Sequence, residues 1–577
     1  MSRSRPTQRL LNQIFTGRFK HAPIAHRVTS SSVRPNCVSI RRPYSTSQLK
    51  SSRLTLPLSV VVAIAGGVGA TYYLVPPLRL DDASLTSAHD SRPGITQPNG
   101  QKLLHYDEVQ KHASEDDCWV IIEGNVYDVT EFLQNHPGGS EIILANAGKD
   151  ATKIWKPLHP PDALDILDPE AHLGPVDPTS IPETLETGPT EEEMRIEEAR
   201  KEMPRADSML LVQDFEEWAE KVLSGTAWNY YKSAADREIT AQENQDAFRN
   251  YYFRPRILHN VTNGSIDTEF MGMKTALPIF ISPAAMAKLG NPLGEVNLTK
   301  GAGEAGIIQG ISINASCSLD EIMEARKEGQ KVIFQIYLNK DRKASEALLE
   351  KVTKLGASAI MFTVDAAWRS KRTRDVRGKT TNMASALLSP SEASSSSSKN
   401  TSKAPLGISQ AISGYQDTNL TWDDISFIRK HTSLPIIVKG VQSVADVEFQ
   451  TMEVVNVISP IDILYEMRAT RPDLFEKIEV MMDGGVRSGA DVVKALALGA
   501  KAVGLGRPFL YANGTHGEEG VVRVCQIMAE EINNTMRNCG ATKISDLTPE
   551  LVGLRGPWVG ANRQPWMMDP SQPPSRS

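Results

Sequence analysis

Two histidines in the first third of the chain have the surroundings of metal ligands. His136 begins a His-Pro-Gly-Gly run and His159 ends a Trp-Lys-Pro-Leu-His run, so each lies among apolar and turn-forming residues. Two imidazoles can bind a haem iron from both faces, and the glycines after His136 allow a tight turn against a porphyrin. A single such run can be only a turn, and a single histidine is usually structural. The spacing of the two, with the strand-like segment Val126–Phe132 before them, favours haem binding.

A second set of chemically capable residues follows strand-like segments in the C-terminal half. Lys439 ends an Ile-Ile-Val-Lys run, and Asp483 opens Asp-Gly-Gly-Val-Arg, which ends at Arg487. Gly506 and Arg507 end another apolar segment. Glycine N–H groups and an arginine together can hold a phosphate group. Lys439 has no easy structural explanation, because burying an unpaired ammonium costs free energy.

The elements that would position these residues alternate between short apolar segments and helix-like sequence from about residue 208 onward. This alternation predicts a parallel sheet whose polar strand ends carry the chemistry, and a (β/α)8 barrel is the natural candidate. Val454–Ile458 is the candidate for a missing sixth strand, so we expect a TIM barrel that is incomplete or perturbed around strand 6. The other candidate strands are Ile279–Ser282, Ile307–Ser312, Val332–Tyr337, Ala359–Asp365, Pro435–Gly440, Val480–Gly485 and Ala502–Gly506.

Composition divides the chain into segments. We predict a presequence at 1–44, a hydrophobic segment at 45–80, a linker at 81–100, a small α+β domain at 101–176, a hinge at 177–207 that becomes a charged helix near Glu191, the large domain at 208–553 and a polar tail at 554–577. Within the large domain, the serine-rich stretch 382–405 has no hydrophobic period and is predicted to be a disordered loop.

The N-terminal segments indicate where in the cell the protein is sorted. No acid precedes Asp81, residues 8–20 form an amphipathic basic helix pattern, and a cleavage-like sequence ends at Tyr44. This composition is typical of a mitochondrial presequence, with a disordered basic tail as the alternative. The uncharged run Leu54–Leu78 is long enough to cross a bilayer. We therefore expect sorting to the mitochondrial inner membrane, with the rest of the protein facing the intermembrane space.

Overall composition excludes few further classes. The net charge of -6 gives no general reason to expect nucleic-acid binding. The five cysteines show neither a disulfide framework nor the spacing of a zinc site.

The motifs resemble two known families. The segment Leu103–Val176 resembles a cytochrome b5 domain, which implies that His136 and His159 are axial haem ligands in one-electron transfer. Residues from about Leu210 to Met536 resemble the FMN-dependent L-2-hydroxy-acid dehydrogenases, on Ser282-Pro-Ala-Ala285, Lys288-Leu-Gly290, Thr363-Val-Asp365 and the two glycine–arginine runs. Together they imply oxidation of L-lactate to pyruvate, with electrons passing from FMN through haem b to cytochrome c, and a homotetramer.

The second resemblance implies roles for individual residues. Tyr230, Tyr337 and Arg372 would bind substrate, Asp365 would orient a histidine base, and Lys439 would stabilise the reduced flavin. The remaining cofactor-binding positions would be Pro283, Ala284, Ala285, Ser312, Gln335, Thr363, Asp483, Gly484, Gly485, Val486, Arg487, Gly506 and Arg507. The alternatives are that Tyr230 and Gln335 are packed polar core residues, and that Arg372 belongs to a solvated basic run.

The chain departs from the family at several positions. Ala284 stands where the family has a flavin-contacting threonine, Ala234 replaces a glycine, and Asn314 replaces an apolar residue that faces the substrate. The largest departure is the loss of the Ser-Asn-His-Gly-Gly-Arg-Gln run that carries the base and an arginine for the substrate carboxylate. After His172 the only histidines are His259, His431 and His516, and none follows a barrel strand.

A reading-frame change would explain this loss. Codons permitted for Phe449–Asn456, read from the third base of the Glu448 codon, include Val-Ser-Asn-His-Gly-Gly-Arg-Gln in full. We hypothesise that the gene encodes the run and that the printed sequence reads it out of frame. Two alternatives stay open: a catalytically inactive haem protein on a barrel scaffold, and a dehydrogenase for another L-2-hydroxy acid, suggested by Asn314.

Overall fold

A computed structural model describes residues 103–136, 140–182, 189–366, 370–378, 408–448, 454–457 and 461–555. The predicted presequence, the hydrophobic segment, the serine-rich loop and nearly all of the polar tail lie outside these ranges. Within them, no helix is both long and apolar enough to span a bilayer.

The smaller domain is built on a four-stranded antiparallel sheet in the order β1-β2-β3-β4. Its strands are β1 (Ala113–Ser114), β2 (Asp117–Ile122), β3 (Asn125–Asp128) and β4 (His172–Pro175), and its helices are α1 (Tyr106–Val109), α2 (Ser140–Leu144) and α3 (Thr152–Trp155). Strand β2 is buried along most of its length because its apolar side chains enter cores on both sheet faces. The α+β prediction is confirmed.

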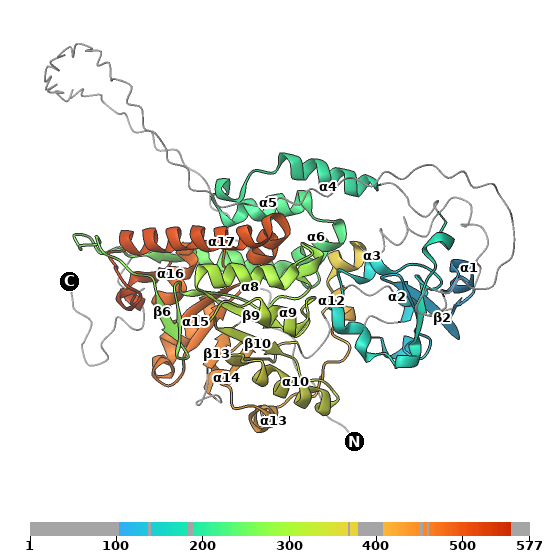
Figure 1. The fold of residues 1–577 in the computed structure, drawn as a ribbon. Coiled ribbons are helices and arrows are strands. Elements are labelled where there is room, and N and C mark those ends of the chain that lie inside the picture. Colours follow the sequence, from blue (N-terminus) through green and yellow to red (C-terminus); the bar gives the residue numbers. More distant parts are fainter. Residues whose placement is uncertain are drawn as a thin grey trace, which may run out of the picture. The chain divides into compact units, whose positions relative to one another are not determined.

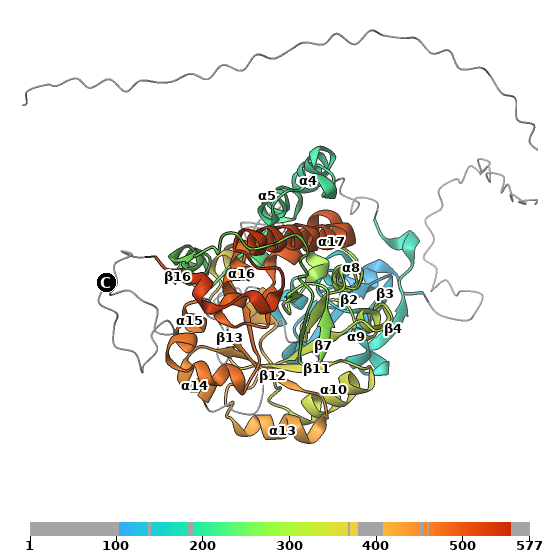
Figure 2. The same cartoon turned by 90° about the vertical axis from the view of Figure 1, so that its left-hand side faces the viewer.

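Eight parallel strands close into a barrel surrounded by helices (Figures 1 and 2). The strands are β8 (Ile279–Ile281), β9 (Ile308–Ser312), β10 (Val332–Ile336), β11 (Ala359–Thr363), β12 (Ile436–Val441), β13 (Val454–Val457), β14 (Val480–Asp483) and β15 (Ala502–Leu505). The outer helices are α8 (Gly294–Ala305), α9 (Leu319–Glu324), α10 (Arg342–Lys354), α12 (Ile408–Ala411), α13 (Asp423–His431), α14 (Val444–Glu448), α15 (Ile461–Thr470), α16 (Gly489–Leu498) and α17 (Arg507–Asn538). All seven segments predicted to be strands contribute to the ring.

The sixth strand carries the expected perturbation. Strand β13 completes the ring from the segment that the sequence offered for this position, so the barrel is closed rather than incomplete. Its pairing with β12 shifts register between Lys439 and Val441, which marks a local irregularity. The residues on both sides of β13 lie outside the described ranges.

The alternation of side chains along each strand determines which groups reach the barrel mouth. Phe280, Ile333, Met361, Ile437 and Met481 pack together in one buried cluster inside the ring. Because side chains on a strand repeat with period two, the residue two positions further on points to the same side. Those next residues are Ser282, Gln335, Thr363, Lys439 and Asp483, so the polar layer lies directly above the apolar one.

A short hairpin closes the opposite end of the barrel. Strands β6 (Thr268–Phe270) and β7 (Met273–Thr275) pair across a two-residue turn, and both turn residues, Met271 and Gly272, have positive φ, as such hairpins require. Phe270 and Met273 join the buried cluster inside the ring. The C-terminal strand ends therefore form the open side.

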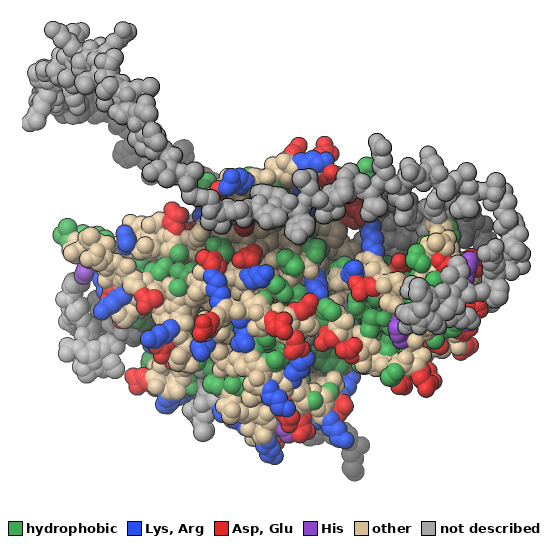
Figure 3. Space-filling model, viewed as in Figure 1, with side chains coloured by type: hydrophobic (Ala, Val, Ile, Leu, Met, Phe, Trp, Pro, Cys, Tyr) green, Lys and Arg blue, Asp and Glu red, His purple; other side chains and the backbone are tan. Residues whose placement is uncertain are grey.

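Helices before the barrel connect it to the hinge. Helix α4 (Glu191–Glu202) begins at the predicted residue with a capping box on Thr190, and none of its residues is buried. Arg200 of α4 donates to the carbonyl oxygen of Gly514 at 3.1 Å. Helices α5 (Val212–Val222) and α6 (Gly225–Lys232) follow. On the face seen in Figure 3, acidic and basic side chains are interspersed over the barrel helices.

Candidate functional site

A cavity of about 520 Å³ opens at the C-terminal ends of the barrel strands. This volume lies in the range of small-molecule and cofactor sites. Every barrel residue that the sequence analysis proposed for substrate or cofactor lines it: Tyr230, Pro283, Ala284, Ala285, Ser312, Gln335, Tyr337, Thr363, Asp365, Arg372, Lys439, Asp483, Gly484, Gly485, Val486, Arg487, Gly506 and Arg507. Residues up to 277 positions apart thus share one site.

One wall of the cavity is a buried chain of hydrogen bonds. Gln335 donates from Nε2 to Thr363 Oγ1 at 3.1 Å, and its Oε1 accepts from Ser312 Oγ at 3.4 Å and from the Ile313 N–H at 3.3 Å. These contacts fix the amide's orientation. Gln335 is therefore both a packed polar residue and a lining residue, because its side chain is ordered toward the cavity by its neighbours.

Lys439 has a charge partner at the cavity floor. Its Nζ lies 3.5 Å from Oδ2 of Asp483, and that oxygen also accepts a hydrogen bond from Ser282 Oγ at 3.0 Å. Both charged side chains are largely buried. The cost of burying the ammonium is thereby offset. Ser282 was proposed only as part of a motif, and its contact with Asp483 was not foreseen.

Asp365 lies close to this pair. Burial raises the pKa of its carboxyl, the positive charge of Lys439 opposes that rise, and the charge of Asp483 adds to it. The residue is open to the cavity, yet its carboxyl is surrounded by protein groups. Gly440 makes the close packing possible: it has φ +108°, and a Cβ there would lie 2.7 Å from the Cβ of Asp365.

Two tyrosines and an arginine that line the cavity are suited to binding a small carboxylic acid. Burial raises the pKa of Tyr230 to about 12 and that of Tyr337 to about 12, so both phenols stay neutral donors near pH 7. The Arg372 guanidinium lies 5.8 Å from the centroid of the Tyr230 ring. A cation beside two O–H donors can bind a carboxylate and a hydroxyl together.

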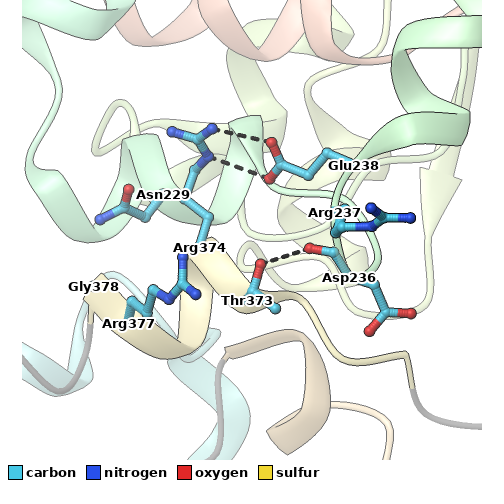
Figure 4. Close-up of a pocket in the computed structure, with 8 residues that line it drawn as sticks. All are labelled: Asn229, Asp236, Arg237, Glu238, Thr373, Arg374, Arg377 and Gly378. Atoms are coloured by element: carbon cyan, nitrogen blue, oxygen red, sulfur yellow. Dashed lines mark hydrogen bonds and ion pairs between the residues drawn. The ribbon is translucent and has the colours of Figure 1, made fainter.

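The residues that follow Arg372 line a second cavity of about 770 Å³ (Figure 4). Arg374 pairs with Glu238 at 3.0 Å, and Thr373 Oγ1 donates to the carbonyl oxygen of Asp236 at 2.7 Å. These bonds join the segment that carries Arg372 to the residues after α6, which carries Tyr230. Arg372 itself is half-buried and lines the cavity at the strand ends, whereas its neighbours Lys371 and Arg374 are exposed.

A second group of lining residues is suited to binding a phosphate group. Gly484 and Gly485 have φ values of +101° and +78°, and long helix α17 begins at Arg507. Burial lowers the pKa of Arg507, because a desolvated guanidinium is less stable. The buried Arg487 Nε and Tyr511 hydroxyl lack hydrogen-bond partners among the described residues, although Arg487 faces Glu216 at 3.7 Å. Buried donors without partners at a helix N-terminus fit the phosphate group of FMN.

The two predicted haem ligands face one another in the smaller domain. The rings of His136 and His159 have centroids 6.1 Å apart and planes 28° apart. Imidazole nitrogens bind metals at about 2 Å, which places two rings on opposite sides of one ion at about this separation. His159 Nδ1 lies 3.0 Å from the carbonyl oxygen of Trp155, so a proton on Nδ1 leaves Nε2 bare for a metal. Burial also lowers the pKa of His159. The pair fits a haem iron.

No histidine lines the barrel cavity among the described residues. His431 lies 3.4 Å from Glu346 on the outer helices, and His516 bonds the carbonyl oxygen of Pro204. The geometry therefore offers no replacement for the base that the family resemblance implies.

Comparison with known proteins agrees with this architecture. The family model described as "FMN-dependent dehydrogenase" matches residues 219–554, and "Cytochrome b5-like Heme/Steroid binding domain" matches residues 105–177. The chain is 40% identical to the L-lactate dehydrogenase (cytochrome) of Wickerhamomyces anomalus, over 78% of this chain and 79% of the relative. It is also 40% identical to that of Saccharomyces cerevisiae, over 81% and 82%.

A solved structure gives the same relationship. The recombinant flavin-binding domain of baker's yeast flavocytochrome b2 is 36% identical, with a TM-score of 0.57, over 68% of this chain and 99% of that one. The family match covers more than half of the chain, and the residues of both predicted cofactor sites converge. The chain belongs to the FMN-dependent dehydrogenase family and carries a cytochrome b5-like haem-binding domain ahead of the family's barrel.

Proposed function

We propose that this protein oxidises L-lactate, or a related L-2-hydroxy acid, to the 2-oxo acid and delivers the electrons to cytochrome c. The observation that carries the proposal is a single cavity whose lining includes glycines and arginines suited to a phosphate group, two tyrosines and an arginine suited to a carboxylate, and Lys439. The paired histidines of the smaller domain add a one-electron centre. The named relatives support cytochrome as the acceptor.

Separate sets of residues would hold FMN and haem. The backbone of Gly484 and Gly485 and the guanidinium groups of Arg487 and Arg507 would hold the FMN phosphate, and Gln335 would line the ring system. When bound, FMN accepts an electron pair and haem passes electrons singly. His136 and His159, whose rings face one another, would hold the haem iron.

The same cavity would bind and orient the substrate. Arg372 and the phenols of Tyr230 and Tyr337 would hold the carboxylate and hydroxyl groups, because all three are cationic or neutral donors. Lys439 would stabilise negative charge that develops beside it, as a buried ammonium does strongly at low local dielectric. Asp365 would orient the base, which must take a proton from the substrate.

That base is the group the printed chain lacks. A missing general base typically lowers the rate by about 10²–10⁴-fold, and a missing carboxylate-binding arginine adds to the loss. We therefore propose that the printed polypeptide has very little dehydrogenase activity and that the natural product contains the run Ser-Asn-His-Gly-Gly-Arg-Gln between β12 and β14. The register shift between Lys439 and Val441, where β12 pairs with β13, supports this view.

Sequencing and turnover test this proposal together. Genomic DNA and cDNA reads across codons 448–457 should reveal the histidine in another frame. The polypeptide encoded by that frame should reduce cytochrome c with L-lactate at least 100-fold faster than the printed one. If no frame encodes the histidine, the frame hypothesis fails; near-normal turnover by the printed chain would instead refute the assignment of the base.

A second function follows if the printed chain is the natural one. The absence of a histidine from the cavity, among the described residues, would then favour a haem protein that transfers electrons without oxidising a hydroxy acid. Such a protein would still bind haem and accept electrons from an added reductant, but lactate would reduce neither of its cofactors under anaerobic conditions.

We also propose the cellular setting and assembly. The protein would be imported by the presequence 1–44, sorted at the inner membrane by residues 45–80, and act in the intermembrane space as a homotetramer. N-terminal sequencing of the mature protein should begin at Ser45 or further along, and light scattering should give four times the mass of the mature chain. An unprocessed N-terminus starting at Met1 would contradict the import route.

A further inference from the structure

The cavity contains a polar side chain that the roles above do not use. Asn314 follows β9, lines the cavity, and is only partly buried. Its backbone N–H donates to Ser312 Oγ at 3.2 Å, which fixes its main chain beside the Gln335 wall. Asn314 is therefore a lining residue whose backbone position is fixed by a hydrogen bond.

A second residue fixes the orientation of the Asn314 amide. The Tyr415 hydroxyl donates to Asn314 Oδ1 at 3.0 Å. Tyr415 is itself held in place, because its carbonyl oxygen accepts from the Lys340 N–H at 3.1 Å and the Asp417 N–H donates to Leu338 at 2.9 Å. A rigid donor on Oδ1 leaves Nδ2 as the free end of the amide.

That free end has no partner among the described residues. Asn314 makes two hydrogen bonds there, one through its backbone N–H and one through Oδ1. The two N–H donors of Nδ2 remain, on a residue that lines the cavity. An acceptor in the ligand would satisfy them, whereas a methyl group would displace water from them without replacing its hydrogen bonds.

We propose that Asn314, oriented by Tyr415, makes the site selective for L-2-hydroxy acids that carry an oxygen acceptor on carbon 3, over L-lactate, which carries only hydrogen there. This rests on the proposed function, because it takes the cavity for the hydroxy-acid site. The substrate class includes acids with a 3-hydroxyl group or a 3-carboxylate group. Sites that hydrogen-bond a substrate oxygen reject analogues that lack it, because their own buried donors are then left unpaired.

A matched pair of ligands tests the inference without turnover. Pyruvate and hydroxypyruvate differ only in the oxygen on carbon 3, and as 2-oxo acids they are products rather than substrates of the proposed reaction. Each is titrated calorimetrically into the full-length, oxidised protein loaded with FMN and haem. We expect hydroxypyruvate to bind about 10-fold more tightly than pyruvate, as one well-made hydrogen bond allows.

Two variants assign the preference to the named residues. Leucine has a similar volume to asparagine and no donor. Asn314→Leu should therefore weaken the binding of hydroxypyruvate about 10-fold and leave the binding of pyruvate unchanged or stronger. The ratio of hydroxypyruvate affinity to pyruvate affinity should fall to one or below. Tyr415→Phe alters no cavity-lining side chain but releases the amide, and should lower the ratio part of the way. Tyr252→Phe removes a hydroxyl from an exposed tyrosine and should leave the ratio unchanged.

The possible results distinguish a failure of the selectivity assigned to Asn314 from a failure of the proposed hydroxy-acid site. If both 2-oxo acids bind and their ratio is the same in the wild type and in Asn314→Leu, the inference is overturned while the function stands. If neither binds to the loaded wild-type protein, the proposed hydroxy-acid site fails, and the inference with it. Should Asn314→Leu not fold, an unchanged ratio in Tyr415→Phe overturns the inference just as directly.

Discussion

The Lys439 ammonium and the Asp483 carboxylate meet at 3.5 Å from strands β12 and β14, the two neighbours of the perturbed strand β13. Ser282 of the β8 end bonds the same carboxylate oxygen, so three strand ends share one polar contact. This contact spans the place where the barrel is least regular. It explains how a lysine can be kept at the cavity floor without an uncompensated charge.

Replacing Lys439 with methionine should show how much the ion pair with Asp483 contributes to the free energy of unfolding. The variant leaves Asp483 largely buried without its cation, and loss of one partner from a buried pair costs about 3 kcal/mol. Urea denaturation of the Lys439→Met protein should show a loss of this size. The double variant Lys439→Met, Asp483→Asn should recover most of it, because the amide can still accept from Ser282; simple additivity of the two single changes would contradict the pairing.

Arg507 should control cofactor affinity more than fold. Its guanidinium is desolvated at the start of α17, and a hydrogen bond to a charged group contributes about 1.5–3 kcal/mol. Arg507→Ala should therefore weaken FMN binding by about 10- to 100-fold. Quenching of flavin fluorescence during titration of the FMN-free protein measures this. Arg249→Ala, at an exposed arginine paired with Asp246, is the control and should bind FMN normally.

The sequence predicted those parts of the site that depend on local pattern. The strands could be located because they are short apolar segments between helix-like ones, and Gln335, Thr363 and Lys439 converge because each follows an interior residue by two positions. The closing role of Val454–Val457 was foreseen only as a possibility, since that segment lacks a regular neighbour on either side.

Other contacts could not be predicted, because they join distant positions with no shared motif. Ser282 and Asp483 are 201 residues apart, and Tyr415 and Asn314 are 101 apart. Glu216, which faces Arg487, lies on a helix before the barrel, and Tyr511 becomes notable only because burial leaves its hydroxyl without a partner among the described residues. Such contacts depend on how the barrel closes, and the spacing of residues within a short sequence segment does not predict this.

Haem binding should depend on both facing histidines and on no other histidine of the domain. His136→Ala and His159→Ala should each lose haem absorbance on purification, because one imidazole cannot complete the bis-histidine site. His172→Gln is the matched control: His172 is exposed on β4, where its ring stacks on Tyr127. Retention of a normal haem spectrum by His159→Ala would refute the ligand assignment.

The stability of the barrel should carry a pH signature from Asp365. Its folded-state pKa is raised by burial, so the protonated form is favoured in the folded protein. A group of this kind stabilises the fold fully below its unfolded pKa, near 3.8, and that contribution is lost as pH rises through the higher folded value. The free energy of unfolding of the wild type, relative to Asp365→Asn, should therefore fall as pH rises from below 4 toward neutrality.

Lys439 supplies a control for the sign of this effect. Its positive charge opposes the rise in the Asp365 pKa, so removing it should raise that pKa further and extend the pH dependence to higher pH. Urea denaturation at closely spaced pH values, with Asp365→Asn compared with its parent in both the wild-type and the Lys439→Met backgrounds, measures both curves. A wild-type difference that is constant, or that grows with pH, would show that burial does not dominate at Asp365 and that the lysine already holds the carboxylate ionised.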